Sequence, residues 1–121
     1  TAAQVRTMLE SVVGPQGTAS KAQVAGYRVG GKTGTAEKIV NGRYSKTDNI
    51  AYFAGFAPMS RPRFIIAVMV DNPRGVYRTG GSVAAPTAAD LASNALRAAN
   101  VPPDSSITDI IIPEEPVEES L

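Results

Sequence analysis

The sequence lacks histidine and cysteine altogether, and no apolar run in it is long enough to cross a membrane. Without histidine, a histidine-based catalytic triad and most zinc sites are excluded within these 121 residues. The absence of cysteine is compatible with any redox compartment and decides nothing about location. Because no stretch of about 18 apolar residues occurs, the sequence predicts no membrane-spanning helix.

Charge is distributed unevenly along the chain. Residues 1–100 carry all 12 Lys and Arg and five of the acids, a net charge of +7, whereas residues 101–121 carry six acids and no base. The first part therefore suits an anionic ligand, and the second is an acidic appendage. The bases are not clustered with aromatic residues, so nucleic acid is not an expected partner. With 43% hydrophobic residues, the chain is expected to form one small domain.

Two helices are predicted, one near each end. Thr1 to Gln4 resembles a capping box, Val5, Met8, Leu9 and Val12 share one helical face, and Gly14-Pro15 ends the helix. The second helix is expected over residues 83–100, with Pro86 in its first turn. Its small-residue face, which should lie close on a sheet, is expected to contain Ala84, Ala88, Leu91, Ala92 and Ala95.

Three strands are predicted between the helices, over residues 23–40, 49–57 and 64–71. Asn41-Gly42 is a hairpin-turn signal directly after the first strand. The short connection at residues 58–62 predicts that the second and third strands pair antiparallel. The continuously apolar run Phe64–Val70 favours a strand buried on both faces. A further short strand is possible at residues 105–112.

The stretch Gly30 to Ala36 concentrates a lysine, two hydroxyls and three glycines. On a strand, alternate side chains share a face, so Lys32 and Gly34 should point one way and Thr33 and Thr35 the other. If this strand lies at an edge, its backbone can pair with an incoming extended peptide. A lysine on an edge strand also discourages aggregation, which is the alternative explanation for Lys32 taken alone.

The stretch and its surroundings resemble the penicillin-recognising serine transpeptidases, and most closely the class B penicillin-binding proteins that cross-link septal peptidoglycan in Gram-negative cell division. The resemblance covers residues from about 5 to about 103 and rests on several motifs in the family's order and spacing. They are Gly26-Tyr27-Arg28-Val29, Lys32-Thr33-Gly34-Thr35-Ala36, Asn41-Gly42-Arg43-Tyr44, Phe53-Ala54-Gly55-Phe56-Ala57-Pro58, Pro62-Arg63-Phe64, Gly80-Gly81 and Ala85-Pro86.

The resemblance implies roles for individual residues. Lys32 would supply positive potential and hydrogen bonds, and the hydroxyls of Thr33 and Thr35 would hold the carboxylate of substrate or penicillin. The N–H of Thr35 would complete an oxyanion hole, and Gly34 would let the acyl group lie against the strand. Gly80 matches a glycine of the family, although Arg78-Thr79 stand where relatives often carry aromatic residues. Tyr52, Phe53 and Phe56 could line the cleft, but aromatic residues in an apolar strand are more often core.

Two motifs that the family needs are missing. Neither Ser-x-x-Lys, which holds the nucleophile, nor Ser-x-Asn occurs. Thr47-Asp48-Asn49 resembles the second motif, but it follows Lys-Thr-Gly where the family places it before, so turn chemistry is expected there. Residues 1–103 are therefore expected to be the C-terminal portion of a transpeptidase domain, with the two motifs upstream. Residues 104–121 are expected to be a flexible acidic tail.

The implied fold is α+β: an antiparallel sheet flanked by helices, part of the penicillin-binding and serine β-lactamase-like fold. The implied reaction is D,D-transpeptidation on the D-Ala-D-Ala end of a peptidoglycan stem peptide, trapped by β-lactams and needing no metal or cofactor. The implied location is the periplasmic part of a protein anchored in the inner membrane, with division proteins as partners. A carboxypeptidase or β-lactamase reaction is the chemical alternative.

Two hypotheses from other functional classes remain. Gly26-(x4)-Gly31-Lys32-Thr33 matches the phosphate-binding P-loop pattern, and Phe64–Val70 followed by Asp71 resembles its magnesium-binding strand. A P-loop must open a helix, however, and Gly34 and the Asn41-Gly42 turn argue against one here. The other reading is a non-catalytic interaction module with an open edge strand and an acidic tail.

Overall fold

The computed structural model describes residues 1–113, and it is built on a three-stranded antiparallel sheet in the order β1-β2-β3. β1 and β3 are therefore both edge strands among the described residues. The element bounds are α1 Ala2–Val13, the 3₁₀ turn η1 Ser20–Ala22, β1 Gly30–Val40, β2 Arg43–Ala57, β3 Phe64–Asp71, the π-helical turn η2 Gly80–Ala84, and α2 Ala85–Ala98.

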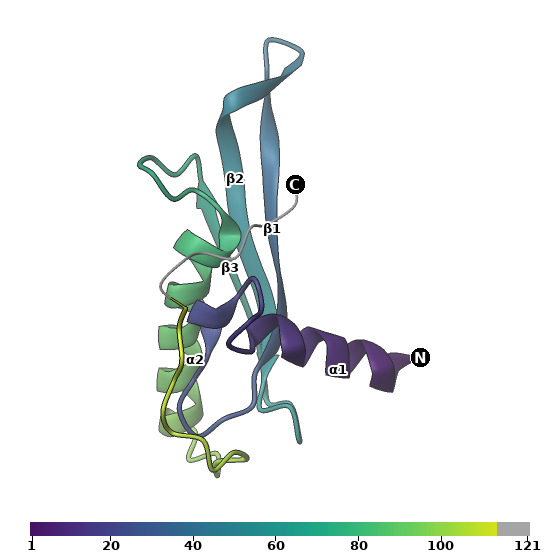
Figure 1. The fold of residues 1–121 in the computed structure, drawn as a ribbon, viewed down its shortest axis with the longest axis vertical. Coiled ribbons are helices and arrows are strands. Elements are labelled where there is room, and N and C mark those ends of the chain that lie inside the picture. The colour runs from purple at the N-terminus through teal and green to yellow at the C-terminus, as the bar shows by residue number, and fades with distance from the viewer. Residues whose placement is uncertain (114–121) are drawn as a thin grey trace.

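The β1–β2 hairpin rises well beyond the rest of the sheet (Figure 1). Asn41 and Gly42 both have positive φ, 52° and 75°, which matches the backbone that a two-residue hairpin turn requires. β2 begins at Arg43, so the prediction that Thr47-Asp48-Asn49 forms a turn is wrong. The pairing shifts between Glu37 and Ile39 in a bulge, and there the Ser45 hydroxyl accepts the N–H groups of Thr47 and Asp48.

The first strand is shorter than predicted, beginning at Gly30 rather than near residue 23. Residues 20–29, which we call the lead-in, contain η1 and then a tight turn, where Val24 bridges Tyr27 and Gly26 has a φ of 83°. The lead-in therefore bends before the chain enters the sheet. β3 matches its prediction at both ends, and β2 pairs with it antiparallel as expected.

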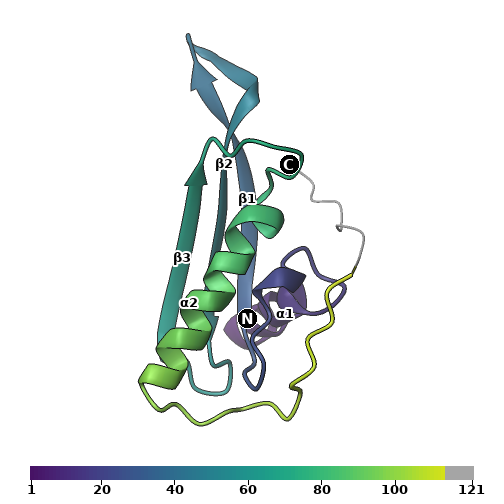
Figure 2. The same cartoon turned by 90° about the vertical axis from the view of Figure 1, so that its left-hand side faces the viewer.

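One face of the sheet is covered and the other is open. α2 lies diagonally across the covered face (Figure 2), where Phe53, Ile66, Ala88 and Leu96 belong to the core. On the open face, Ile65 is 88% exposed. The prediction that β3 is buried on both faces is therefore wrong for the part of the chain that the structure describes. The apolar run makes a strand, but covering the second face needs a layer that residues 1–113 do not supply.

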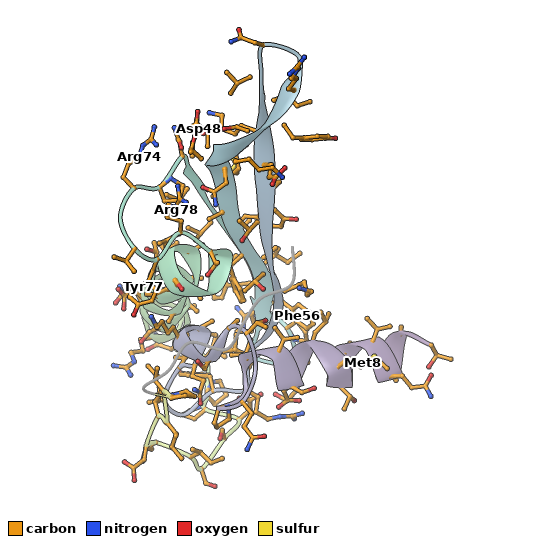
Figure 3. The ribbon with its side chains drawn as sticks, turned by 45° about the horizontal axis from the view of Figure 1, so that its top comes forward. Met8, Asp48, Phe56, Arg74, Tyr77 and Arg78 are labelled. Carbon is orange, nitrogen blue, oxygen red and sulfur yellow. The ribbon has the colours of Figure 1, made fainter. Side chains whose placement is uncertain are left out.

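α1 projects sideways past β1, away from α2 (Figure 1). Only part of its predicted apolar face is buried: Val12 packs against the core, whereas Val5 and Met8 are more than half exposed, and Met8 points away from the sheet (Figure 3). Two polar contacts hold the helix base. Arg28 forms two hydrogen bonds with the Glu10 carboxylate, at 2.7 and 2.8 Å, and Arg6 donates to the carbonyl of Met59. The bond to Glu10 and its negative charge raise the pKa of Arg28 above its ordinary value.

α2 begins two residues later than predicted, because η2 occupies residues 80–84. Pro86 lies in its first turn, and Ala84, Ala88 and Ala92 are buried as expected. Leu91 was expected on the buried face but is half exposed, whereas Leu96 is fully buried. The small side chains set how closely the helix approaches, and the one large buried leucine sits at its far end.

Residues 101–113, which we call the strap, return from α2 alongside the lead-in to β1 (Figure 2). The short strand predicted at residues 105–112 does not form. Instead, the Asp104 carboxylate accepts the backbone N–H of Arg28 at 2.7 Å and of Ser60 at 3.1 Å. Gly26 accepts the N–H groups of Asp104 and Ser105 and donates to Ile107. The first part of the predicted tail is thus tied to the body, and residues 114–121 lie outside the described part.

Candidate functional site

The candidate site lies on β1, the edge strand whose outer side has no neighbour among residues 1–113. The predicted alternation is observed there. Thr33 is only 4% exposed and lies on the covered face, whereas Lys32 is exposed on the open face. Gly34 pairs across the ladder with Tyr52, which shares the face of Lys32. The edge thus presents one cation and one glycine side by side.

Lys32 donates from Nζ to the carbonyl oxygen of Thr33 at 2.9 Å. Within residues 1–113, no carboxylate forms an ion pair with it. By contrast Lys38, on the same strand, is paired with Asp71 at 2.7 Å. The charge of Lys32 therefore remains available to an anionic group that approaches the edge.

The two threonine hydroxyls of the motif are held by the protein itself. The Thr35 Oγ1 accepts the backbone N–H of Gly80 at 3.2 Å, and the Thr33 hydroxyl lies 3.2 Å from the hydroxyl of Thr18. Since a hydroxyl can accept one bond while donating another, the Thr35 O–H proton remains free for a further acceptor. This geometry is compatible with binding a carboxylate through Thr35.

Gly80 permits the close approach of η2 to the sheet. A Cβ built there would collide with the carbonyl oxygen of Tyr52 and would lie 2.7 Å from that of Gly34. Both obstacles are backbone atoms and cannot move aside. Only glycine at this position lets the N–H reach Thr35, so Gly80 acts through Thr35 from the covered face.

Gly34 is enclosed by an aromatic ring. A Cβ added at this glycine would overlap the ring and hydroxyl of Tyr52, which lies directly across the ladder. Tyr52 is 43% exposed, so the ring forms part of the open surface beside Lys32. The structure thus gives a second reason for glycine here, beyond the expected need to admit an acyl group.

Phe53 does not belong to the surface that was predicted for it. It is 2% exposed and is among the largest fully buried side chains of the described residues. A Cβ added at Gly31 would press on its ring. Strand alternation explains the correction, because neighbours in β2 must face opposite ways and Tyr52 takes the open side. Phe56 is half-buried near the base of α1 (Figure 3).

The P-loop interpretation is contradicted by the backbone. Lys32 is followed by strand to Val40, with no helix whose N-terminus could face a phosphate. Asp71, which would have held magnesium, instead accepts a hydrogen bond from Lys38. No group of three potential metal ligands occurs among residues 1–113, and none of the described helices is long and apolar enough to span a bilayer.

The loop between β3 and η2, residues 72–79, borders the site next to Thr35. Arg78 donates to the carbonyl of Thr47 at 2.7 Å, and Arg74 lies 3.4 Å from the carboxylate of Asp48 (Figure 3). These arginines therefore hold the loop against β2. A cavity of about 290 Å³ lies beneath the loop next to Thr35, and Asn49 lines it. The Asn49 side chain donates to Arg78, while its oxygen is buried without a partner among the described residues.

Sequence reasoning missed Thr18 and Asn49. Thr18 lies 15 residues before Thr33, in a loop whose path no periodic pattern predicts. Asn49 was predicted at the start of the second strand, with Thr47 and Asp48 before it as turn chemistry, but its contact with the carbonyl of Arg78 depends on the path of the loop before η2.

Comparison with known proteins matches residues 1–93 to the family described as the penicillin binding protein transpeptidase domain. Stage V sporulation protein D of Bacillus subtilis is 47% identical over 103 residues, which are 85% of this chain and 16% of the relative. The probable peptidoglycan D,D-transpeptidase PenA of Neisseria meningitidis is 43% identical over 108 residues, 89% of this chain and 19% of the relative. The chain thus spans less than a fifth of these relatives.

Solved structures agree with the sequence matches. The transpeptidase domain of Burkholderia pseudomallei penicillin-binding protein 3 superposes with a TM-score of 0.76 at 51% identity, covering 84% of this chain and 31% of that one. Penicillin-binding protein 3 of Mycobacterium tuberculosis, solved in complex with ampicillin, gives a TM-score of 0.74 at 34% identity, covering 89% and 26%. The antiparallel sheet with its two helices is therefore part of the fold of these domains.

Proposed function

The chain belongs to the family of penicillin-binding protein transpeptidase domains, and from that premise we propose that it supplies the Lys-Thr-Gly strand of a serine-type peptidoglycan D,D-transpeptidase. The matched relative from Neisseria carries the name of that activity. In this proposal the nucleophilic serine, in Ser-x-x-Lys, and the Ser-x-Asn motif belong to sequence upstream of residue 1. Residues 1–113 alone are inactive.

The observation that carries the proposal is the free edge of β1. Its outer backbone groups have no strand partner in residues 1–113, and an extended stem peptide can add to them as a further strand. Lys32 stands on this edge with an unpaired charge beside Gly34. A D-Ala-D-Ala end carries a carboxylate, so edge and charge together select an extended anionic peptide.

The proposed chemistry is acyl transfer. The serine oxygen attacks the carbonyl carbon of the penultimate D-alanine, and negative charge develops on the carbonyl oxygen. The Thr35 N–H and the N–H of the serine stabilise that oxygen. The C–N bond breaks, terminal D-alanine leaves as the protonated amine, and an amine of a neighbouring stem peptide attacks the ester. A β-lactam stops the reaction at the ester, because its leaving group remains tethered.

The hydroxyl of Thr35 binds the carboxylate of the substrate or the β-lactam in this scheme. Its bond from Gly80 supports this role, because an oxygen that already accepts one hydrogen bond is oriented to donate its own proton. Thr33 acts less directly, since its hydroxyl is buried against Thr18. Tyr52 borders the acyl group from the open face.

We further propose that the parent protein acts at the bacterial cell wall during division, on the periplasmic side of an inner-membrane anchor, with other division proteins as partners. The matched relatives include both a named D,D-transpeptidase and a sporulation protein. A role in septal synthesis fits both. The non-catalytic interaction module stays as the second candidate, supported by the open edges of β1 and β3.

The experiment uses the complete transpeptidase domain and a D-Ala-D-Ala stem peptide, with and without an acceptor amine. Transpeptidation predicts release of D-alanine and a cross-linked product, together with a long-lived adduct with penicillin. A carboxypeptidase would release D-alanine without cross-linking, and a β-lactamase would hydrolyse penicillin with turnover. A folded domain that does none of these supports the interaction module instead. Residues 1–121 alone should form no penicillin adduct in intact-mass measurements.

A further inference from the structure

The strap carries a row of isoleucines that face outward. Ile107 is 69% exposed and Ile111 is 63% exposed, with Ile110 and Ile112 partly exposed beside them. The backbone beneath is fixed, since Ile107 accepts the N–H of Gly26 and Ile111 accepts the side-chain amide of Gln23. Several large aliphatic side chains held outward by hydrogen bonds to the body are unusual for a surface that only meets water.

A cavity opens directly beside this row. It has a volume of about 170 Å³ and lies between the strap and the C-terminal end of α1. Its apolar lining comes from both sides of the gap, from Val13, Pro15, Val24, Ile107 and Ile110. The space is suited to one aliphatic side chain of an incoming segment.

Charge around the cavity is negative overall. The charged groups in its lining are Glu10, Arg28 and Asp109, and the Asp104 carboxylate accepts the backbone N–H of Arg28. The single cation is already bound by Glu10 through two hydrogen bonds. An occupant is therefore favoured if it is basic.

We propose that the strap and the end of α1 form a docking groove for a basic segment of a partner protein, which inserts an aliphatic side chain into the cavity. Residues 94–121 lie past the part matched by the family, so the groove is partly built from sequence that the family match does not include. The groove is also separate from β1, and occupying it leaves Lys32 and the free edge accessible.

The test measures fluorescence anisotropy of a labelled peptide against the complete transpeptidase domain. The probe has a central Leu-Leu between lysines, and two control peptides replace either the lysines by glutamates or the leucines by serines. We expect the probe to bind saturably with a Kd below about 100 µM and the two control peptides not to bind. Ile107→Ser with Ile110→Ser should weaken binding at least about tenfold, and Asp109→Asn by a few-fold.

The matched control is Ile39→Ser on the β1–β2 hairpin, because Ile39 is 68% exposed, like Ile107. It should leave binding unchanged. Reaction with a fluorescent penicillin reports that each variant is folded. If the Ile107→Ser, Ile110→Ser double variant does not fold, Ile111→Ser takes its place. Equal binding by wild-type and strap variants would overturn the proposal. So would absence of probe binding, whether the domain's own upstream part or a second copy, seen as dimer by sedimentation, covers the groove.

Discussion

At the scale of single residues, the site depends on what each hydroxyl already holds. Thr35 accepts from Gly80 and can still donate, whereas Thr33 is buried against Thr18. The two threonines of the motif, equal in the sequence, are therefore unequal in space. Gly34 is likewise constrained from two directions, by the edge that a ligand would approach and by the ring of Tyr52.

Replacing Thr35 by alanine in the complete domain keeps the backbone N–H and removes only the hydroxyl. A hydrogen bond to a charged group contributes about 1.5–3 kcal/mol, so the second-order rate of acylation by penicillin should fall about tenfold to a hundredfold. Thr33→Ala should cost less in rate and more in stability, because its hydroxyl is buried. Stopped-flow acylation rates and thermal melts measure both; the reverse order would contradict the assignment.

Replacing Gly34 by alanine tests the role of Tyr52. The added Cβ overlaps the tyrosine ring, so Gly34→Ala should displace the ring, lower the melting temperature and slow acylation. Tyr52→Ser removes the obstacle, and in that background Gly34→Ala should cost much less stability. A double-mutant cycle with thermal melts measures the coupling. Additive losses would mean that the ring does not limit residue 34.

At the scale of elements, the fold was predictable where a pattern repeats and unpredictable where a contact is long-range. The apolar run of β3 and the Asn41-Gly42 turn each determined a strand or turn locally. The contact of Thr18 with Thr33 and the hydrogen bonds from Arg28 and Ser60 to the Asp104 carboxylate depend on the paths of the loops. No periodic pattern in the sequence encodes those paths. The exposure of Ile65 was unpredictable for another reason, since an apolar pattern indicates burial but not the partner that provides it.

The strap's attachment makes a prediction at this scale. Asp104 accepts two backbone N–H groups from different segments, at Arg28 and Ser60. Asp104→Asn loses the charge and one acceptor, so the free energy of unfolding should fall by about 1–2 kcal/mol. Asp109→Asn is the control, because the Asp109 carboxylate accepts no hydrogen bond from the described residues. Urea unfolding of the complete domain measures the stability of both variants. Equal stability of the two would contradict the claim that the Asp104 carboxylate stabilises the attachment of the strap.

At the scale of the whole molecule, the sheet of the described part is covered on one face only. One face of the sheet is packed by α2, while the other exposes Ile65 and Met69, and α1 extends outward with Met8 uncovered. A chain that spans under a third of the matched solved domains leaves such surfaces for the remainder to cover. We therefore expect the rest of the domain to cover Ile65, Met69 and Met8.

The isolated chain is therefore expected to associate. The edge of β3 and its open apolar face both invite pairing with another copy. Ile65→Lys with Met69→Lys should shift sedimentation toward monomer, and Ile39→Lys on the hairpin should not. A sharp melt of a wild-type monomer, with no association on raising the concentration, would contradict this prediction.

The central claim is that the β1 edge is the active-site edge, and Lys32 tests it most directly. The measurement is the second-order rate of acylation by penicillin in the complete domain, for Lys32→Ala against Lys38→Ala on the same strand. Lys32 is unpaired and Lys38 is held by Asp71, so the account predicts a loss of about a hundredfold or more for Lys32→Ala and a change within about twofold for Lys38→Ala. Circular dichroism checks that both are folded. A near-normal rate for folded Lys32→Ala would contradict the claim.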